Sequence, residues 1–273
     1  MPFADTFRAI KRVGRPLKPY LAAMGSHTYG QYGEDALVFS ALKPSRRGFY
    51  VDVGAYDPLE GSNTYKLYQR GWRGLTIEPN PKPVWKFKLL RGGDTHLTMG
   101  IAAAPETLKY YEFDIAMLNT MDGDRAKALD AEGHKIVRTR EIPCERLDKI
   151  LTERAPGKHI DLLNVDCEGA DLTVLQTIDF VEHRPTVIIM EDLDAYYGMR
   201  NNDAPSSIMQ FMTSRGYAPI ARLVYSTVYV ALDWRTLNQR SNAYREAAIH
   251  PGLLPEGDVP KFKAEEMKVA AAG

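Results

Sequence analysis

The chain has 273 residues and 44% of them are apolar, which is enough to bury a full core in one large domain. Its 35 basic residues balance 35 acidic ones, which argues against nucleic acid or an anionic membrane as a partner of the whole chain. The two cysteines, Cys144 and Cys167, form no CxxC pair or ligand cluster. We therefore expect reduced thiols and a cytoplasmic protein, and a disulfide between them stays the minor alternative.

Residues 1–30 form a basic N-terminal arm in which arginines and lysines alternate with single apolar residues. The arm lacks the apolar run of a signal peptide, and no segment elsewhere has the length and apolarity of a membrane span. One interpretation is that it docks on a membrane surface or on a partner in glycan assembly. The simpler one is an arm that packs on its own domain or a loose terminus.

The stretch from Gly48 to Asp57 organises the domain that follows. Residues 48–53 form an apolar strand that runs into a loop, and Ser62, Asn63 and Thr64 then open a helix. Open α/β sheets bind their ligands in the crevice beyond the carboxyl ends of such strands. We therefore expect a cofactor site in this loop.

The residues of the loop narrow the choice of cofactor. A dinucleotide needs the pattern G-x-G-x-x-G for its pyrophosphate, but here a single glycine, Gly54, lies between Asp52 and Asp57. Two carboxylates repel phosphate and suit a ligand with an ammonium and a sulfonium, which predicts S-adenosylmethionine. Asp52 or Asp57 would hold its amino group, and Gly54 would admit the methionyl chain. The alternative is a turn that merely needs glycine and aspartate.

The next strand, at residues 75–78, ends in Glu78. In a βαβ unit an acid at this tip can accept both hydroxyls of a ribose, because a carboxylate offers two acceptor oxygens. Taken alone, such an acid is more often a solvated strand tip. The loop and helix that precede it favour the ribose interpretation.

Further elements are expected on both sides of this unit. We predict helices at 34–42, 83–90, 147–154 and 206–215, a strand at 95–102, a strand at 108–113 outside the parallel core, an edge strand at 135–143, and a closing antiparallel pair at 218–224 and 227–232. The polar stretch 115–135 is either a mobile flap near the substrate or a surface insertion. Residues 235–273 should form a C-terminal helix and a tail, which would serve as a tail or an oligomer arm.

Two more apolar strands end in acids. Residues 160–165 lead into Asp166 and Glu168, and residues 186–190 lead into Glu191 and Asp192. Parallel strand tips point the same way, so these acids should converge beside the cofactor loop. Clustered carboxylates raise one another's pKa, bind a divalent ion or act as a general base. Each acid alone would be a helix cap or a solvated tip.

The order of these motifs resembles the FkbM-type methyltransferases, which are S-adenosylmethionine-dependent O-methyltransferases. The likeness covers about residues 31–232. It rests on QYGED at 31–35, GFYVDVGA at 48–55, SNT at 62–64 followed by GWRG at 71–74, IEPNP at 77–81, and DLLNVDCEGA at 161–170. The sequence departs from the family pattern at Asn164 and Cys167, where lysine and an aliphatic residue are common, and at Asp171, where glutamate is common.

The resemblance implies an α/β, Rossmann-like class I methyltransferase domain over residues 31–234. Its seven-stranded, mostly parallel sheet would have the order 3-2-1-4-5-7-6 with helices on both faces. It also implies methyl transfer to a hydroxyl, often of a sugar, with a glycan, polysaccharide or glycoside as the acceptor. The alternatives are a non-catalytic, cofactor-binding partner of a glycan-assembly complex and an NAD-dependent oxidoreductase.

The motifs and the resemblance together give a set of expected site residues. We assign S-adenosylmethionine contacts to Gln31, Asp52, Gly54, Asp57, Ser62, Asn63, Glu78 and Asn80. Asp166 and Glu168 are the expected catalytic acids. The resemblance to related sugar O-methyltransferases adds a divalent cation, such as Mg²⁺, held by Asp166, Glu191 and Asp192. Because this chain has Asn164 where the family commonly has lysine, any role of that lysine in the family does not carry over to this chain.

Overall fold

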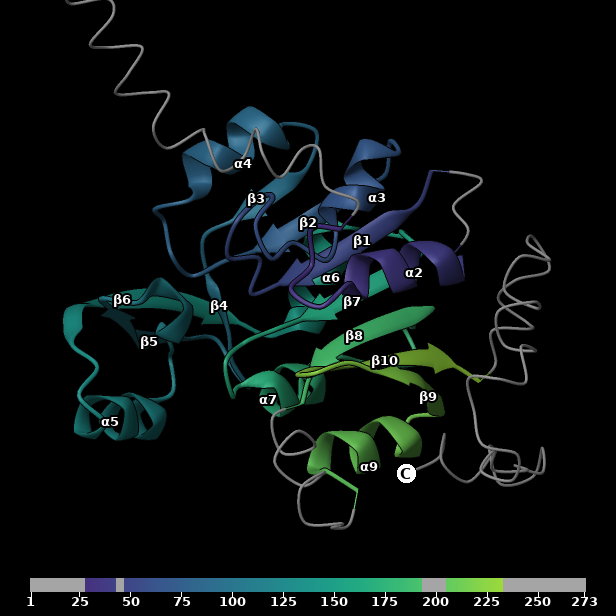
Figure 1. Cartoon of the computed structure of the whole chain (residues 1–273). Helices are drawn as coiled ribbons and strands as arrows, with labels where there is room; N and C mark the ends of the chain where they lie inside the picture. Colours follow the sequence, from purple (N-terminus) through teal and green to yellow (C-terminus); the bar gives the residue numbers. More distant parts are fainter. Residues whose placement is uncertain (1–27, 43–46, 193–204, 233–273) are drawn as a thin grey trace, which may run out of the picture.

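The larger of two sheets has the predicted strand order. The computed structural model describes residues 28–42, 47–192 and 205–232 (Figure 1). Its seven-stranded sheet runs β3-β2-β1-β7-β8-β10-β9, which is 3-2-1-4-5-7-6 when only the strands of this sheet are counted. The strands are β1 (Phe49–Val53), β2 (Arg73–Ile77), β3 (Thr95–Leu97), β7 (Leu162–Val165), β8 (Val187–Glu191), β9 (Tyr217–Arg222) and β10 (Ser226–Ala231).

Strand direction brings the functional loops to one edge of this sheet. Strands β3, β2, β1, β7 and β8 are mutually parallel, and β10 is antiparallel to both β8 and β9. The carboxyl ends of the parallel strands therefore meet along a single edge. This is where the sequence predicted that the acids would converge.

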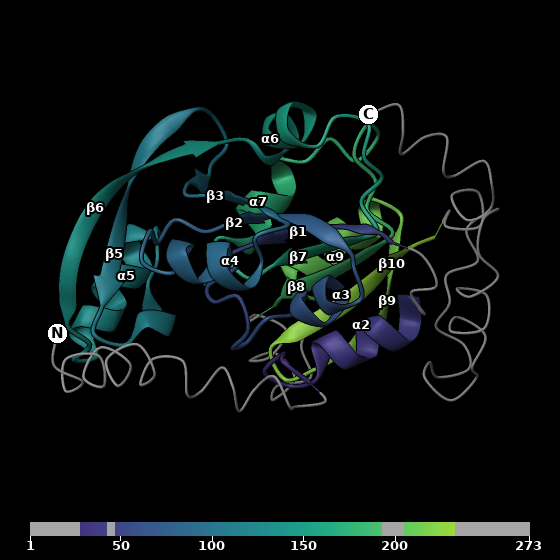
Figure 2. The same ribbon diagram turned by 90° about the horizontal axis from the view of Figure 1, so that it is seen from above.

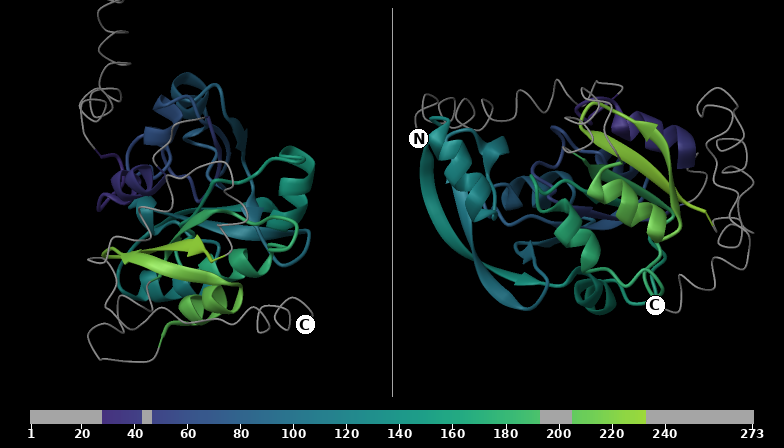
Figure 3. Two further views of the ribbon diagram at one scale, coloured as in Figure 1. Left: turned by 90° about the vertical axis from the view of Figure 1, so that its right-hand side faces the viewer. Right: turned by 90° about the horizontal axis from the view of Figure 1, so that it is seen from below.

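Helices cover both faces of the sheet, as predicted. Helices α2 (Glu34–Leu42) and α3 (Tyr65–Gln69) pack with Tyr50 on one face, and α6 (Leu147–Arg154), α7 (Asp171–Gln176) and α9 (Ser207–Ser214) pack with Val51 and Val53 on the other. This division follows from the alternation of side chains along β1. Figure 2 shows α3 and α4 (Val84–Leu90) from above, and Figure 3 shows α7 and α9 from below.

A second sheet of three strands carries the segment between β3 and α6. Its order is β4-β6-β5, with β4 (Gly100–Ile101), β5 (Glu106–Phe113) and β6 (Ile136–Glu145). The 3₁₀ helix η1 (Ala116–Leu118) and α5 (Gly123–Ala131) connect β5 to β6. We call residues 106–145 the lobe, and it projects from the main sheet in Figures 1 and 2.

One expectation about this region was wrong. The single strand predicted at 95–102 is divided between β3 in the large sheet and β4 in the small one. A local pattern gives the extent of a strand but not the neighbours with which it pairs. In the predicted edge strand, 135–143, residues 136–143 pair with β5 alone, and β6 pairs with β4 only beyond them, at Cys144 and Glu145.

Several expectations lie outside the described residues. These are the arm up to residue 27 and the C-terminal helix and tail at 235–273. Within the described residues, Cys144 and Cys167 are both free thiols, as expected. None of the described helices combines the length and the apolar composition of a membrane span.

Candidate active site

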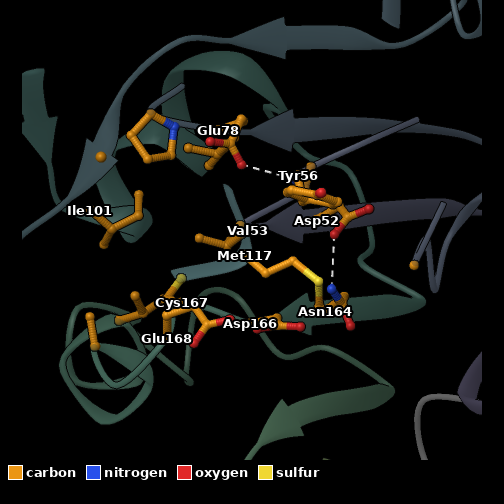
Figure 4. A pocket seen from close by; sticks show the side chains of 18 of the residues that line it. Asp52, Val53, Tyr56, Glu78, Ile101, Met117, Asn164, Asp166, Cys167 and Glu168 are labelled. Atoms are coloured by element: carbon orange, nitrogen blue, oxygen red, sulfur yellow. Dashed lines mark hydrogen bonds between the residues drawn. The ribbon is translucent and has the colours of Figure 1, made fainter. Parts of the chain in front are cut away.

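A pocket of about 260 Å³ lies at the carboxyl ends of β1, β2 and β7 (Figure 4). Eight of the predicted site residues line it: Gln31, Asp52, Gly54, Ser62, Asn63, Glu78, Asp166 and Glu168. Figure 4 shows Glu78 toward one end and Asp166 with Glu168 toward the other, with Val53 and Met117 between them. Most residues assigned to the cofactor and both residues assigned to catalysis therefore line one cavity, whereas Asp57 and Asn80 are not among its lining residues.

Gly54 permits the close approach of two strand tips under this pocket. Its φ is +77°, and a Cβ at this position would lie 1.7 Å from the backbone carbonyl oxygen of Asp166. Its amide also donates to the carbonyl oxygen of Ile77 at 2.9 Å. Glycine alone satisfies both the backbone conformation and the missing space, so this residue fixes the floor between β1, β2 and β7.

Asp52 is held in place by other side chains of the protein. It is 2% exposed, and its two carboxylate oxygens accept from the Thr64 hydroxyl and, at 2.9 Å, from the Asn164 amide. The Arg91 guanidinium lies 3.9 Å from it. Burial raises the pKa of Asp52, and the charge of Arg91 opposes that shift. Asp52 is thus an anchor of the pocket wall as well as a candidate ligand for an ammonium.

Asn63 carries an unsatisfied acceptor at the pocket wall. Its amide nitrogen donates to Oδ1 of Asn164 at 3.0 Å, whereas its own Oδ1 is buried and has no hydrogen-bond partner within the described structure. A buried acceptor without a partner is costly, so a donor group on a ligand would satisfy this atom. The ammonium of S-adenosylmethionine would supply such a donor, and the residues at this end of the pocket fit that cofactor.

Glu78 has the position predicted for a ribose acceptor. Its two oxygens accept from the backbone amides of Tyr56 and Asn80, at 2.8 and 2.7 Å. Each oxygen keeps a second lone pair, so the carboxylate can still accept from a diol. Burial raises the pKa of Glu78 to about 7, and the two amide hydrogen bonds oppose that shift. The ionisation of Glu78 therefore changes near neutral pH.

Three of the predicted cofactor residues also have structural roles. Asp57 pairs with Lys86 at 2.8 Å and accepts from the amides of Leu59 and Glu60. Asn80 uses its side-chain oxygen to accept from the amide of Lys82 at 3.0 Å. Ser62 lines the pocket, and its hydroxyl accepts from the Tyr65 amide at the start of α3. Of the two acids proposed for the amino group, Asp52 is the one in the pocket wall.

The acids after β7 and β8 do converge, but in a different set from the one expected. Oxygens of Asp166, Glu168 and Glu191 lie within 4.8 Å of one another. Asp192 is not in this group, because it is buried and accepts from the Ser206 hydroxyl at 2.6 Å. Of the three residues predicted to hold a metal, Asp166 and Glu191 are therefore in this group, and Glu168 joins them. We call Asp166, Glu168 and Glu191 the acid group.

Burial and mutual repulsion dominate the electrostatics of the acid group. Burial raises the pKa of Asp166, and the negative charges of Asp171 and Glu168 raise it further. Burial likewise raises the pKa of Glu191, with Asp166 and Glu168 adding to the shift. Such acids favour a proton, a cation or a hydroxyl donor near them.

Sequence reasoning missed Arg125, which the lobe brings to the acid group. Its guanidinium pairs with Glu168 at 2.7 Å, and Glu168 itself has a left-handed backbone conformation with a φ of 52°. Nothing in the polar stretch around Arg125 distinguished it from a surface arginine. The lobe also supplies Tyr110, Met117 and Met121 to the pocket wall. Of the two interpretations left open for residues 115–135, this position agrees with the one that places them near the site.

The sheet order, the pocket at its carboxyl edge, the acid at the tip of β2 and the single glycine after β1 define a Rossmann-like methyltransferase. Residues 52–219 match the methyltransferase FkbM domain, and the chain belongs to this family. This match confirms the family that the ordered motifs indicated. No curated protein matches the chain.

The role of Gly54 can be tested by unfolding measurements on paired glycine variants. Gly54→Ala should lower the free energy of unfolding by at least about 3 kcal/mol, because it adds a steric overlap to an unfavourable φ. Gly133 is a matched control, since its φ is +97° and no atom lies within 4 Å of the position of its Cβ. Gly133→Ala should cost only about 1 kcal/mol. Equal losses in urea denaturation would contradict a special close approach at Gly54.

Proposed function

We propose that this protein is an S-adenosylmethionine-dependent O-methyltransferase that acts in the cytoplasm on a hydroxyl of a sugar in a glycan, polysaccharide or glycoside. The observation that carries the proposal is one cavity with Glu78 at one end and two members of the acid group, Asp166 and Glu168, at the other. The first suits the ribose of the cofactor, and the second suits the hydroxyl that is methylated. The free thiols of Cys144 and Cys167 support the proposed location.

The cofactor end of the pocket binds through groups that suit a cation and a diol. When bound, S-adenosylmethionine supplies a methyl group that its sulfonium activates for transfer. Glu78 would accept from the ribose hydroxyls, and Asn63 and Asp52 would accept from the amino group. An NAD-dependent oxidoreductase is disfavoured because the loop at Gly54 lacks the glycines that a pyrophosphate requires.

The other end of the pocket would orient the acceptor and take its proton. Holding the acceptor oxygen in line with the transferred methyl group removes much of the entropic cost of the reaction. A carboxylate of the acid group would accept the hydroxyl proton as the oxygen–carbon bond forms. The raised pKa values of Asp166 and Glu191 make each a stronger base when it is ionised.

The acid group also fits a divalent cation. Its three carboxylates offer hard oxygen ligands, and the Oε2 atom of Glu191 is buried without a hydrogen-bond partner. Asp166, Glu168 and Glu191 would hold Mg²⁺, which would act as a Lewis acid on the acceptor oxygen. Arg125 competes for this site because its guanidinium already pairs with Glu168.

Methyl transfer can be tested on the glycans of the host. We expect a methyl mass shift on a saccharide in cells with the active protein and its loss in cells without it, measured by mass spectrometry. Calorimetry with S-adenosylmethionine separates the alternatives. Cofactor binding with no shift in any glycan fraction would favour a non-catalytic partner of glycan assembly, and binding of NADH in its place would overturn the methyltransferase assignment.

The raised pKa of Glu78 predicts a pH-dependent affinity for the cofactor. An ionised carboxylate accepts from the ribose hydroxyls better than a protonated one, and its pKa is about 7 in the unliganded protein. The affinity measured by calorimetry should therefore fall by about tenfold from pH 8 to pH 6. Glu78→Gln should bind more weakly, with little dependence on pH in this range. An equally steep pH profile in that variant would assign the titration to another group.

Competition between Arg125 and a cation gives a test of the metal assignment. Arg125→Gln should tighten Mg²⁺ binding severalfold, because Glu168 is no longer paired, and Glu191→Gln should weaken it at least about tenfold. Asp192→Asn distinguishes the two ligand sets, since Asp192 is engaged with Ser206 and its change should leave the affinity nearly unaltered. If calorimetry detects no Mg²⁺ binding in any of these proteins and chelation spares activity, the reaction needs no metal.

A further inference from the structure

Two tyrosines form an aromatic corner beside the acid group. The rings of Tyr32 and Tyr225 meet edge to face, with centroids 5.3 Å apart and an angle of 75° between their planes. Tyr32 is 43% exposed, so part of its ring remains open to solvent. The function proposed above does not use this pair.

The backbone ties both tyrosines to the functional edge of the sheet. Tyr225 immediately precedes β10, whose first residue, Ser226, pairs in register with Glu191 of the acid group. The carbonyl oxygen of Tyr225 accepts from the amide of Asp192 at 2.8 Å. Tyr32 follows Gln31, which lies in the pocket wall. The corner is thus attached to the edge of the pocket at two places far apart in sequence.

Glu34 joins the two sides of the corner. This acid is 2% exposed, and its carboxylate accepts from the Tyr32 amide at 2.8 Å and from the Ser226 hydroxyl at 3.4 Å. It therefore links the start of α2 to the start of β10. A single buried carboxylate fixes the backbone under both rings, so their arrangement is part of the fold.

The groups around the corner match the two sides of a pyranose ring. The C–H groups of a sugar face are apolar and pack on the negative face of an aromatic ring, whereas its hydroxyls need acceptors. The acid group supplies carboxylate acceptors, and the buried Oε2 atom of Glu191 has no hydrogen-bond partner in the described structure. We propose that Tyr32 and Tyr225 bind the pyranose ring of the acceptor and direct one of its hydroxyls toward Glu191. This inference rests on the proposed methyltransferase function.

Charge narrows the class of sugar further. Glu34 lies beneath Tyr32, and Asp166 and Glu191 add two more acids at this edge of the sheet, whereas Arg125 is already paired with Glu168. An anionic substituent on the bound ring would meet like charges, which disfavours uronic acids and phosphorylated sugars. The acceptor ring is therefore a neutral pyranose.

Binding of simple glycosides tests this subsite independently of turnover. The probes are neutral methyl pyranosides, with a methyl uronoside as the anionic counterpart. Saturation-transfer NMR of the full chain with S-adenosylhomocysteine should detect at least one neutral glycoside and a weaker signal from the uronoside. Tyr32→Ala and Tyr225→Ala should each raise the dissociation constant of the neutral glycoside about five- to tenfold, which corresponds to the loss of one aromatic contact.

Conservative and remote variants show whether the rings themselves bind. Tyr32→Phe and Tyr225→Phe keep the ring and should stay within about twofold of the parent protein. Trp85→Ala removes another exposed ring, 48% exposed on α4, and should have no effect. Affinity for S-adenosylhomocysteine should be the same in all of these proteins.

The outcomes separate this subsite from the function on which it rests. If S-adenosylhomocysteine does not bind the parent protein, the methyltransferase proposal fails. If it binds but no neutral glycoside does, or if the alanine variants bind the glycoside as the parent does, the aromatic subsite is wrong. Tighter binding of the uronoside, or of a phenolic compound in place of every glycoside, would overturn the assignment of a neutral pyranose.

Discussion

Burial of the Arg91 guanidinium is the constraint on which the pocket depends. The side chain has no exposed surface, and it donates to Asp94 at 2.9 Å and to the hydroxyls of Tyr50 and Thr64 at 3.0 Å. A buried cation is tolerated only when anions and acceptors surround it, so these partners must keep their places. Thr64 in turn donates to Asp52. The cation under the sheet edge thereby fixes the carboxylate at the wall of the pocket.

A polar row across the sheet extends this constraint to the neighbouring strands. In register, Asp52 of β1 lies between Thr76 of β2 and Asn164 of β7, and Thr76 shares a hydrogen bond with His96 of β3. The amide of Asn164 donates to Asp52 and accepts from Asn63 at the same time. The lysine that the family resemblance implies at this position could only donate. Asn164 therefore holds Asp52 and Asn63 together at the pocket wall in a way that a lysine could not.

The sequence predicted local elements and strand tips well, because both depend on short-range patterns. Helices at 34–42 and 147–154 have the predicted bounds, and Gly54 and Glu78 lie in the pocket as expected. Partners across the fold were harder to predict. Glu191 and Asp192 are adjacent, and only the packing of Ser206 shows which of the two turns away from the acid group. Arg125 was missed for the same reason, since its partner Glu168 is 43 residues away.

The lobe contributes charge balance to the site more than it contributes stability. Arg125 and Glu168 are both partly exposed, at 28% and 27% of their side chains, and an ion pair in such a place adds little to folding. Its effect on the acid group is larger, because the three half-buried carboxylates repel one another and Arg125 offsets one of the charges. The same lobe lines the pocket with Met117 and Met121, so it contributes both to the shape of the cavity and to the charge balance of the acid group.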